Sequence, residues 1–272
     1  MADKLGILAG GGDLPRLIIE ACRKKNRDFH VFALEGQTDP ETVEGVPHDW
    51  FRLGAAGSAL KRALELEIKD VVLAGRVTRP SFSSIRPDWK TMAFLVRVSG
   101  KVRGDDSLRR KIVEGIEDEG FNVVGANSLL ADLSPEAGIL GRHEPDDDAR
   151  ADIERGLEVL RAMSAADVGQ AVVVQQAIVL GVEAIEGTDA LISRCADLRR
   201  EGPGGVLVKI AKVGQEKRAD LPTIGPETVQ RAVAAGLRGI AVGADASIIL
   251  RRDEVVRAAD EAGLFLIALE SD

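Results

Sequence analysis

The chain has 272 residues, of which 45% are hydrophobic and 29% charged, and its formal net charge at pH 7 is −8. This length and composition predict a soluble globular protein with enough apolar residues for two domains. The acidic charge and an aromatic content of 3% disfavour nucleic acid as the main partner, because phosphate backbones attract cations and bases stack on aromatic rings.

The cysteines and the hydropathy of the chain bear on its compartment. Cys22 and Cys195 have no CxxC spacing and are too few for a disulfide framework, so we expect buried thiols in a reducing cytoplasm. No apolar run approaches the roughly 20 residues that span a bilayer, and no signal peptide is recognisable. The sequence predicts a cytoplasmic protein and leaves peripheral membrane contact open, because an apolar patch can form from residues distant in sequence.

A strand, a glycine turn and a helix are predicted at the start of the chain. Residues 4–9 have the apolar pattern of a buried strand, Gly10, Gly11 and Gly12 follow, and a helical pattern with Pro15 in its first turn comes next. Consecutive glycines allow a backbone to approach a ligand and to direct N–H groups at an anion, which makes Gly11 and Gly12 candidate ligand contacts. A tight turn without a ligand is the alternative.

The same turn has part of a dinucleotide-binding fingerprint. Glu35 follows the next predicted strand, about where an acid that binds a ribose would lie. Pro15 stands where the fingerprint has its third glycine, which packs the helix against the strand. A nicotinamide-dependent enzyme therefore remains an alternative.

Polar residues also follow the third predicted strand, which covers residues 70–75. The strand ends at Gly75, Arg76 and Val77, and open α/β sheets bind their ligands at the carboxyl ends of strands. The guanidinium group of Arg76 can bind a phosphate through two parallel hydrogen bonds. This strand end is therefore a second candidate ligand position.

The apolar pattern lapses from about residue 134 to 148, where two prolines and two glycines occur. We expect a linker at 134–148 between an N-terminal α/β domain of residues 1–133 and a C-terminal α/β domain of residues 149–272. A short strand, Gly125 and a short helix complete the first domain. The glycine turn makes a Rossmann-like N-terminal domain the expected form, and the C-terminal domain is predicted to be mixed α/β.

Two polar clusters lie near predicted strands of the second half. Gln170 directly precedes one strand, and Glu183 lies at the end of the next. The loop at 186–189 then offers two carboxylates and a hydroxyl group, which can hold a hard cation or a sugar hydroxyl. Alternatively, Thr188 or Asp189 caps the following helix. The two roles are compatible.

The stretch from Val206 to Thr228 places charge at the end of another predicted strand. Four cations, two carboxylates and an amide fall within twelve positions, and this mixture suits an anionic substrate, with or without a metal ion. Most charge runs are solvated loops, but Pro222 and Gly225 fix the backbone after this one. The residues concerned are Lys209, Lys212, Gln215, Glu216, Lys217, Arg218 and Asp220.

Eight segments that together span essentially the whole chain carry a resemblance to a known family. They are LGILAGGGDLP, LAGRVTRP, GDDSLRR, GFNVVGAN, DVGQ, EAIEGTDALI, VLVKIAKVGQEKRADLPTIG and GLFLIAL. With them the chain resembles the bacterial UDP-2,3-diacylglucosamine pyrophosphatases of the LpxI type, which act in lipid A assembly. The EGTD and RADLPTIG segments are the most specific.

The resemblance implies a metal-dependent hydrolase that splits the pyrophosphate of a UDP-sugar carrying two acyl chains. The products are UMP and the acylated sugar 1-phosphate, lipid X. The family looks like a two-domain α/β protein with its ligand in a cleft between the domains. Val213 stands where we expect a proline, and this departure concerns the shape of the lysine-rich loop.

The resemblance also implies a role for Asp220, which lies in RADLPTIG and corresponds to the family's key acid. We expect Asp220 to bind Mg²⁺ or Mn²⁺ or to orient the attacking water. Glu186 and Asp189 are further candidate metal ligands. The expected substrate contacts are Gly11, Gly12, Gly75, Arg76, Val77, Gly125, Ala126, Gln170, Gly187, Thr188, Lys209, Lys212, Gln215, Arg218 and Thr223, with Lys209, Lys212 and Arg218 on phosphate.

The two acyl chains of the implied substrate need an apolar surface. The helical segment 89–98 is a candidate wall for them, although core packing or a dimer face is the commoner role of such a helix. The expected partners are the acylated UDP-sugar, with a second copy of the chain and the inner-membrane surface left open. The pyrophosphatase is the favoured hypothesis, ahead of a nicotinamide-dependent oxidoreductase and a non-catalytic nucleotide-sugar binding module.

Overall fold

The computed structural model describes residues 3–78, 87–98, 105–216, 218 and 221–270. The chain forms two compact units. The first comprises Met1–Leu130 and Arg218–Asp220, and the second Ala131–Lys217 and Leu221–Asp272. None of the helices in the described ranges combines the length and the apolar composition that a bilayer crossing requires.

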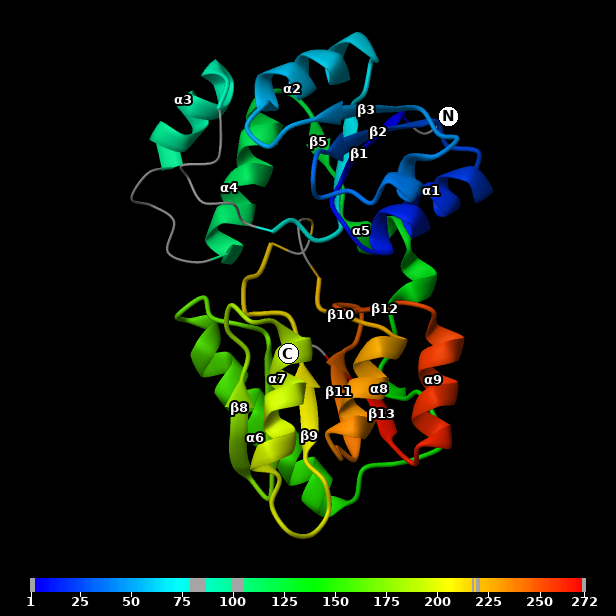
Figure 1. The fold of residues 1–272 in the computed structure, drawn as a ribbon, viewed down its shortest axis with the longest axis vertical. Helices are drawn as coiled ribbons and strands as arrows, with labels where there is room; N and C mark the ends of the chain where they lie inside the picture. Colours follow the sequence, from blue (N-terminus) through cyan, green and yellow to red (C-terminus); the bar gives the residue numbers. More distant parts are fainter. Residues whose placement is uncertain (1–2, 79–86, 99–104, 217, 219–220, 271–272) are drawn as a thin grey trace. The chain divides into compact units, whose positions relative to one another are not determined.

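A five-stranded sheet forms the centre of the N-terminal unit (Figure 1). Its strand order is β3-β2-β1-β4-β5, and every neighbouring pair is parallel. The inner strands are nearly continuous apolar runs because helices cover both faces of a parallel sheet. The strands are β1 (Leu5–Ala9), β2 (Phe29–Leu34), β3 (His48–Phe51), β4 (Asp70–Ala74) and β5 (Asn122–Val123).

Helices pack on both faces of this sheet (Figure 1). Leu60 of α2 and Ile116 of α4 join Phe32 of β2 in one apolar cluster, so α2 and α4 cover the same face. Helices α1 and α5 pack against each other and against β4. The helices are α1 (Leu14–Lys24), α2 (Ala56–Glu65), α3 (Trp89–Val98), α4 (Asp105–Asp118) and α5 (Ala126–Leu129), with a 3-10 turn η1 (Pro40–Val43).

A six-stranded mixed sheet forms the centre of the C-terminal unit, in the order β6-β13-β11-β9-β7-β8. The three strands β9, β11 and β13 are parallel, whereas β6, β7 and β8 each run antiparallel to a neighbour. A separate parallel pair joins β10 to β12. The strands are β6 (Gly138–Ile139), β7 (Ala171–Gln175), β8 (Ile178–Val182), β9 (Val206–Lys209), β10 (Thr223–Ile224), β11 (Gly239–Gly243), β12 (Ile248–Ile249) and β13 (Phe265–Leu269).

The C-terminal unit has three layers because side chains alternate across its strands. Val172 and Val208 face α6, which covers one side of the sheet. Val173 and Leu207 face the opposite side, where they share a core with α7, α8 and α9. The helices are α6 (Asp147–Ser164), α7 (Thr188–Cys195), α8 (Pro226–Ala234) and α9 (Arg252–Glu261), with 3-10 turns η3 (Ala131–Leu133) and η4 (Ala196–Leu198).

The predicted α/β class and the two buried, unpaired cysteines are confirmed. Part of the predicted linker 134–148 is regular structure. Gly138 and Ile139 form β6 and pair with β13, and α6 begins at Asp147. The sequence does not reveal β6 because two residues are too few to show a periodic pattern.

Gly156 provides a test of how closely α6 packs on its sheet. A Cβ atom at this position would lie 2.6 Å from Cγ2 of Val208 on β9, so the helix approaches the strand more closely than alanine permits. For Gly156→Ala, overpacking of about 1–3 kcal/mol should exceed the gain of about 1 kcal/mol in helix propensity. We expect a lower melting temperature.

The matched control is Glu154→Ala, an alanine substitution at an exposed position of the same helix. Its melting temperature should remain close to that of the wild type. A rise in melting temperature for Gly156→Ala, measured by circular dichroism, would show that α6 can move away from β9 without cost.

Candidate functional site

The glycine turn and the residues after β4 lie at the point where the strand order of the N-terminal sheet reverses. The chain runs from β1 to β2 and β3 on one side and then returns to β4 and β5 on the other. The carboxyl ends of β1 and β4 are therefore neighbours, and such a switch point is the usual ligand position of an open α/β sheet. Hydrogen bonds between Gly11 and Arg76, 2.9 Å in both directions, hold the two loops together.

The glycines allow these two backbones to approach closely. A Cβ atom at Gly10 would lie 2.5 Å from the carbonyl oxygen of Arg76, and one at Gly75 would lie 2.6 Å from that of Gly11. Gly75 also has a φ of +89°, in the region that favours glycine. Close packing between the loops is thus sufficient to explain glycine at these positions.

All three N–H groups of the glycine turn already have partners within the protein. Gly10 donates to the carbonyl of Ala74 at 2.7 Å, and Gly11 to that of Arg76. The carboxylate of Asp39 accepts from Gly12 at 3.0 Å. In this arrangement none of the three N–H groups is open to an anion. Contact of a ligand with Gly12 N–H stays a prediction and requires the Asp39 carboxylate to move away.

Arg76 and Val77 lie exposed beside this turn. The Arg76 backbone is fixed by Gly11, whereas its guanidinium group makes no hydrogen bond or ion pair with any residue that the structure describes. An exposed guanidinium without a carboxylate partner is well suited to bind a phosphate group.

Three further predicted contacts lie in the same unit. Gly125 precedes α5, Ala126 is its first residue, and a Cβ atom at Gly125 would lie 3.5 Å from Cα of Arg218. The guanidinium of Arg218 forms an ion pair with Glu117 of α4 at 2.5 Å. Arg218 therefore belongs with the N-terminal unit although it follows β9 in sequence.

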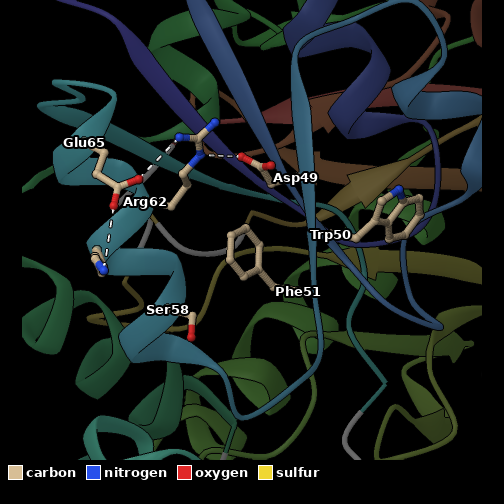
Figure 2. A pocket seen from close by; sticks show the side chains of 7 residues that line it. Asp49, Trp50, Phe51, Ser58, Arg62 and Glu65 are labelled. Carbon is tan, nitrogen blue, oxygen red and sulfur yellow. Dashed lines mark hydrogen bonds and ion pairs between the residues drawn. The ribbon is translucent and has the colours of Figure 1, made fainter.

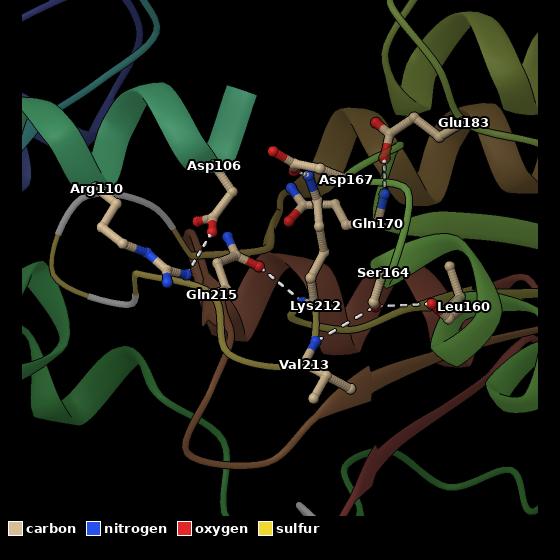
Figure 3. A network of polar contacts seen from close by, with 10 residues as sticks. All are labelled: Asp106, Arg110, Leu160, Ser164, Asp167, Gln170, Glu183, Lys212, Val213 and Gln215. Atoms are coloured by element: carbon tan, nitrogen blue, oxygen red, sulfur yellow. Dashed lines mark hydrogen bonds and ion pairs between the residues drawn. The ribbon is translucent and has the colours of Figure 1, made fainter. Parts of the chain in front are cut away.

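A buried chain of hydrogen bonds joins four predicted or noted residues of the C-terminal unit. Lys209 is 7% exposed, and its ammonium group donates to the hydroxyl of Thr188 at 2.8 Å and to the carbonyl of Thr223 at 3.0 Å. That hydroxyl donates in turn to Oε1 of Glu183 at 2.7 Å. Oε2 of Glu183 accepts from the backbone N–H of Gln170 at 2.9 Å (Figure 3). The arrangement brings Gln170, Thr188, Lys209 and Thr223 together.

Glu183 belongs to this cluster but was not among the predicted site residues. It lies immediately after β8 and is 7% exposed, so its carboxyl group is almost fully removed from solvent. Buried acids are rare unless they are paired, and this one contacts two predicted substrate contacts. Its place at the end of an apolar strand, close before the 186–189 loop, was the available signal in the sequence.

A tight turn holds the loop that carries Lys212 and Gln215. The side chain of Gln215 accepts from the backbone N–H of Lys212 at 2.8 Å, and Ser164 at the end of α6 accepts from Val213 N–H at 3.3 Å (Figure 3). The ammonium group of Lys212 pairs with Asp167 at 2.6 Å. Val213, which stands where we expected a proline, is compatible with this turn and is exposed.

Two of the three candidate metal ligands, Glu186 and Asp189, each face an arginine instead of one another. Glu186 accepts from Arg194 at 2.9 Å, and Asp189 lies 3.6 Å from Arg231. The Glu186 backbone N–H and then Arg194 hold the pKa of the Glu186 carboxyl below its usual range. Across the described ranges, no group of three or more His, Cys, Asp or Glu side chains is placed to hold a metal ion. Asp220, the predicted catalytic residue and metal ligand, lies outside the described residues.

A pocket of about 300 Å³ in the N-terminal unit contains none of the predicted site residues. It lies between β3 and α2, and Arg62 extends from α2 between Asp49 and Glu65 (Figure 2). These two ion pairs occupy the guanidinium group. The predicted site is therefore distinct from this pocket and follows the strand ends instead.

Comparison with known proteins identifies the family. Residues 4–133 match the family model described as the LpxI N-terminal domain, and residues 136–267 match the LpxI C-terminal domain. The UDP-2,3-diacylglucosamine pyrophosphatase LpxI of Caulobacter vibrioides is 40% identical over 275 residues, which cover 98% of this chain and 98% of that protein. The chain belongs to the LpxI family. The resemblance found in the sequence is thereby confirmed, and both LpxI domains are present.

The Thr188 hydroxyl can be tested as the bridge between Lys209 and Glu183. Thr188→Val keeps the shape of the side chain but leaves an ammonium and a carboxyl group each short of one hydrogen bond. We expect the free energy of unfolding to fall by about 2–3 kcal/mol, because buried charged groups that lose a partner are costly. Thr188→Ser retains the hydroxyl and is the matched control. Equal urea midpoints for the two variants would contradict the bridge.

Proposed function

We propose that this chain hydrolyses the pyrophosphate bond of UDP-2,3-diacylglucosamine to UMP and 2,3-diacylglucosamine 1-phosphate, a step of lipid A biosynthesis. The observation that carries the proposal is 40% identity with a pyrophosphatase of that name across 98% of both chains. The enzyme is therefore assigned as a hydrolase of a nucleotide sugar. Family membership extends over both domains, so the whole activity is proposed and not a single binding function.

Cations at strand ends support an anionic substrate. Arg76 offers a guanidinium with no partner among the described residues, Lys209 is the last residue of β9, and Lys212 follows that strand. Hydrolysis of a pyrophosphate moves charge onto phosphoryl oxygens, which fixed cations stabilise. Lys212 and Arg218 are held by Asp167 and Glu117, so phosphate binding by either requires it to share or leave its carboxylate.

We assign Asp220 as the catalytic carboxylate. It either orients the attacking water or binds a metal ion. Glu186 and Asp189 do not fit a magnesium site with each other, because each is paired with an arginine. We retain Mg²⁺ or Mn²⁺ as the proposed cofactor, since a divalent cation bound to the substrate would neutralise phosphoryl charge. No further step is assigned to it.

A nicotinamide-dependent oxidoreductase is the weaker alternative. In dinucleotide-binding folds the pyrophosphate contacts the glycine turn and the helix N-terminus, whereas here the Asp39 carboxylate accepts from Gly12. The negative charge of the Asp39 carboxylate would repel the pyrophosphate of a dinucleotide at this position.

We further propose that the N-terminal domain is Rossmann-like in its strand order. We also propose that the protein works in the cytoplasm and meets its lipid substrate at the inner-membrane surface.

Asp220→Asn tests the catalytic assignment. The change keeps size and removes the carboxylate, and we expect turnover of the diacylated UDP-glucosamine to fall by at least about 100-fold with an unchanged melting temperature. Asp253→Asn, at an exposed position on α9, is the matched control and should retain turnover. Unchanged turnover of Asp220→Asn would overturn the role of Asp220.

Metal removal and labelled water test the reaction itself. UMP release should stop in a chelator and return with Mg²⁺ or Mn²⁺. In heavy-oxygen water, label in UMP would assign attack to the uridine-side phosphorus, and label in the sugar phosphate would assign the other. A folded protein that binds the nucleotide sugar without turnover under any metal would favour the binding-module alternative.

A further inference from the structure

Helix α3 carries an exposed apolar stripe. Trp89, Met92 and Val96 are 80%, 48% and 69% exposed. Positions i, i+3 and i+7 of a helix lie within about 60° of one another, so these side chains form one stripe along the helix. Isolated apolar side chains on a surface are normal, but three aligned on one helix indicate an interaction surface.

The opposite side of α3 is fixed to the N-terminal unit. Thr91 donates to the carbonyl of Gly54 at 2.8 Å and accepts from Ala56 N–H at 3.1 Å. Asp88 accepts from Thr91 N–H and from Gly57 N–H, both at 2.8 Å. These bonds tie the start of α3 to the start of α2 (Figure 1). The three side chains of the stripe remain exposed to solvent.

The sequence around α3 has a charge opposite to that of the whole chain. Residues 76–103 contain seven basic and one acidic side chain, a net charge of +6, whereas the chain has −8. A helix with an apolar stripe including tryptophan, set in a basic segment, is typical of a surface that lies in the headgroup region of an acidic bilayer. Along the sequence, basic residues therefore flank the apolar stripe on both sides.

A second copy of the chain is a less suitable partner for the stripe than a bilayer. A two-fold symmetric contact through α3 would bring two segments of net charge +6 together, and like charges repel. Three side chains also cover much less than the roughly 800 Å² per partner of a stable dimer interface. An acidic bilayer attracts the positive charge, and three inserted side chains are a contact of ordinary size for a helix that lies on a membrane surface.

We propose that α3 docks the protein on an acidic phospholipid surface, with Trp89, Met92 and Val96 inserted among the headgroups. The purpose of docking rests on the proposed function, because a substrate with two acyl chains resides in a bilayer. The surface itself depends only on the exposure and charge around α3, and its test therefore does not require catalysis.

The first experiment measures binding of the full chain to vesicles by sedimentation. Vesicles of phosphatidylcholine with about 30% phosphatidylglycerol should bind the protein at least about tenfold more tightly than phosphatidylcholine alone, and added salt should weaken binding. The triple variant Trp89→Gln, Met92→Gln and Val96→Gln should lose at least about tenfold in affinity for the acidic vesicles. Equal binding to both vesicles, or none, overturns the proposal.

The matched control replaces three exposed apolar residues that do not share a face. Leu64, Ile178 and Val233 are 61%, 45% and 44% exposed and lie on α2, β8 and α8. Their simultaneous change to glutamine should leave vesicle binding as in the wild type. An equal loss of binding in both triple variants overturns the assignment to α3.

The second experiment keeps the stripe intact and so does not depend on how the triple variant folds. The chain has two tryptophans, and Trp50→Phe leaves Trp89 as the single fluorophore. Acidic vesicles should shift its emission to shorter wavelength, and lipids with brominated acyl chains should quench it. No shift with vesicle-bound protein places another surface on the bilayer and overturns the proposal.

Two readouts separate docking from the proposed reaction and from a dimer. Binding to acidic vesicles that hold no substrate should fall in the triple variant, and turnover of substrate held in such vesicles should fall with it. Absence of all turnover would reject the proposed function and leave the vesicle result standing. A dimer by light scattering that the triple variant converts to a monomer would assign the stripe to a second copy and overturn docking.

Discussion

A carboxyl group and an ammonium group, both almost fully buried and joined through one hydroxyl, set the geometry of the C-terminal strand ends. Neither Glu183 nor Lys209 can exchange its partner for water, so the Thr188 hydroxyl between them must stay within hydrogen-bond distance of both. This requirement fixes the first turn of α7 relative to β9. It also explains why a threonine begins α7, since its hydroxyl accepts from one partner and donates to the other.

The N-terminal strand ends are organised by backbone packing instead of charge. Glycines at the ends of β1 and β4 let the two loops exchange hydrogen bonds directly, and Arg76 is left exposed beside them. The N-terminal unit thus has an accessible cation in Arg76. In the C-terminal unit, Lys209 and Lys212 are already bonded to neighbouring groups. Both groups of strand ends carry proposed contacts of the nucleotide sugar.

The sequence predicts those features that depend on local pattern. Apolar runs identify strands such as β7 and β11, and the order of strands and helices identifies an α/β protein. It could not show that Asp39, 27 residues away, accepts from Gly12, because glycine reports the freedom of the backbone and not its hydrogen-bond partner. The sequence shows Glu183 at the end of a strand but not its burial, since burial of an acid depends on tertiary packing. The exposed stripe of α3 is visible in the helical pattern, but only the fold distinguishes it from a core face.

The ion pair between Arg218 and Glu117 limits how the chain can be divided into fragments. Arg218 follows β9 in sequence, yet it pairs with Glu117 and belongs to the N-terminal unit. A fragment that ends at Leu130 lacks this guanidinium and leaves a glutamate on α4 without its counter-ion. The two halves of the chain are consequently not interchangeable modules, and a chimera that joins the N-terminal half of one family member to the C-terminal half of another must match α4 to the segment after β9.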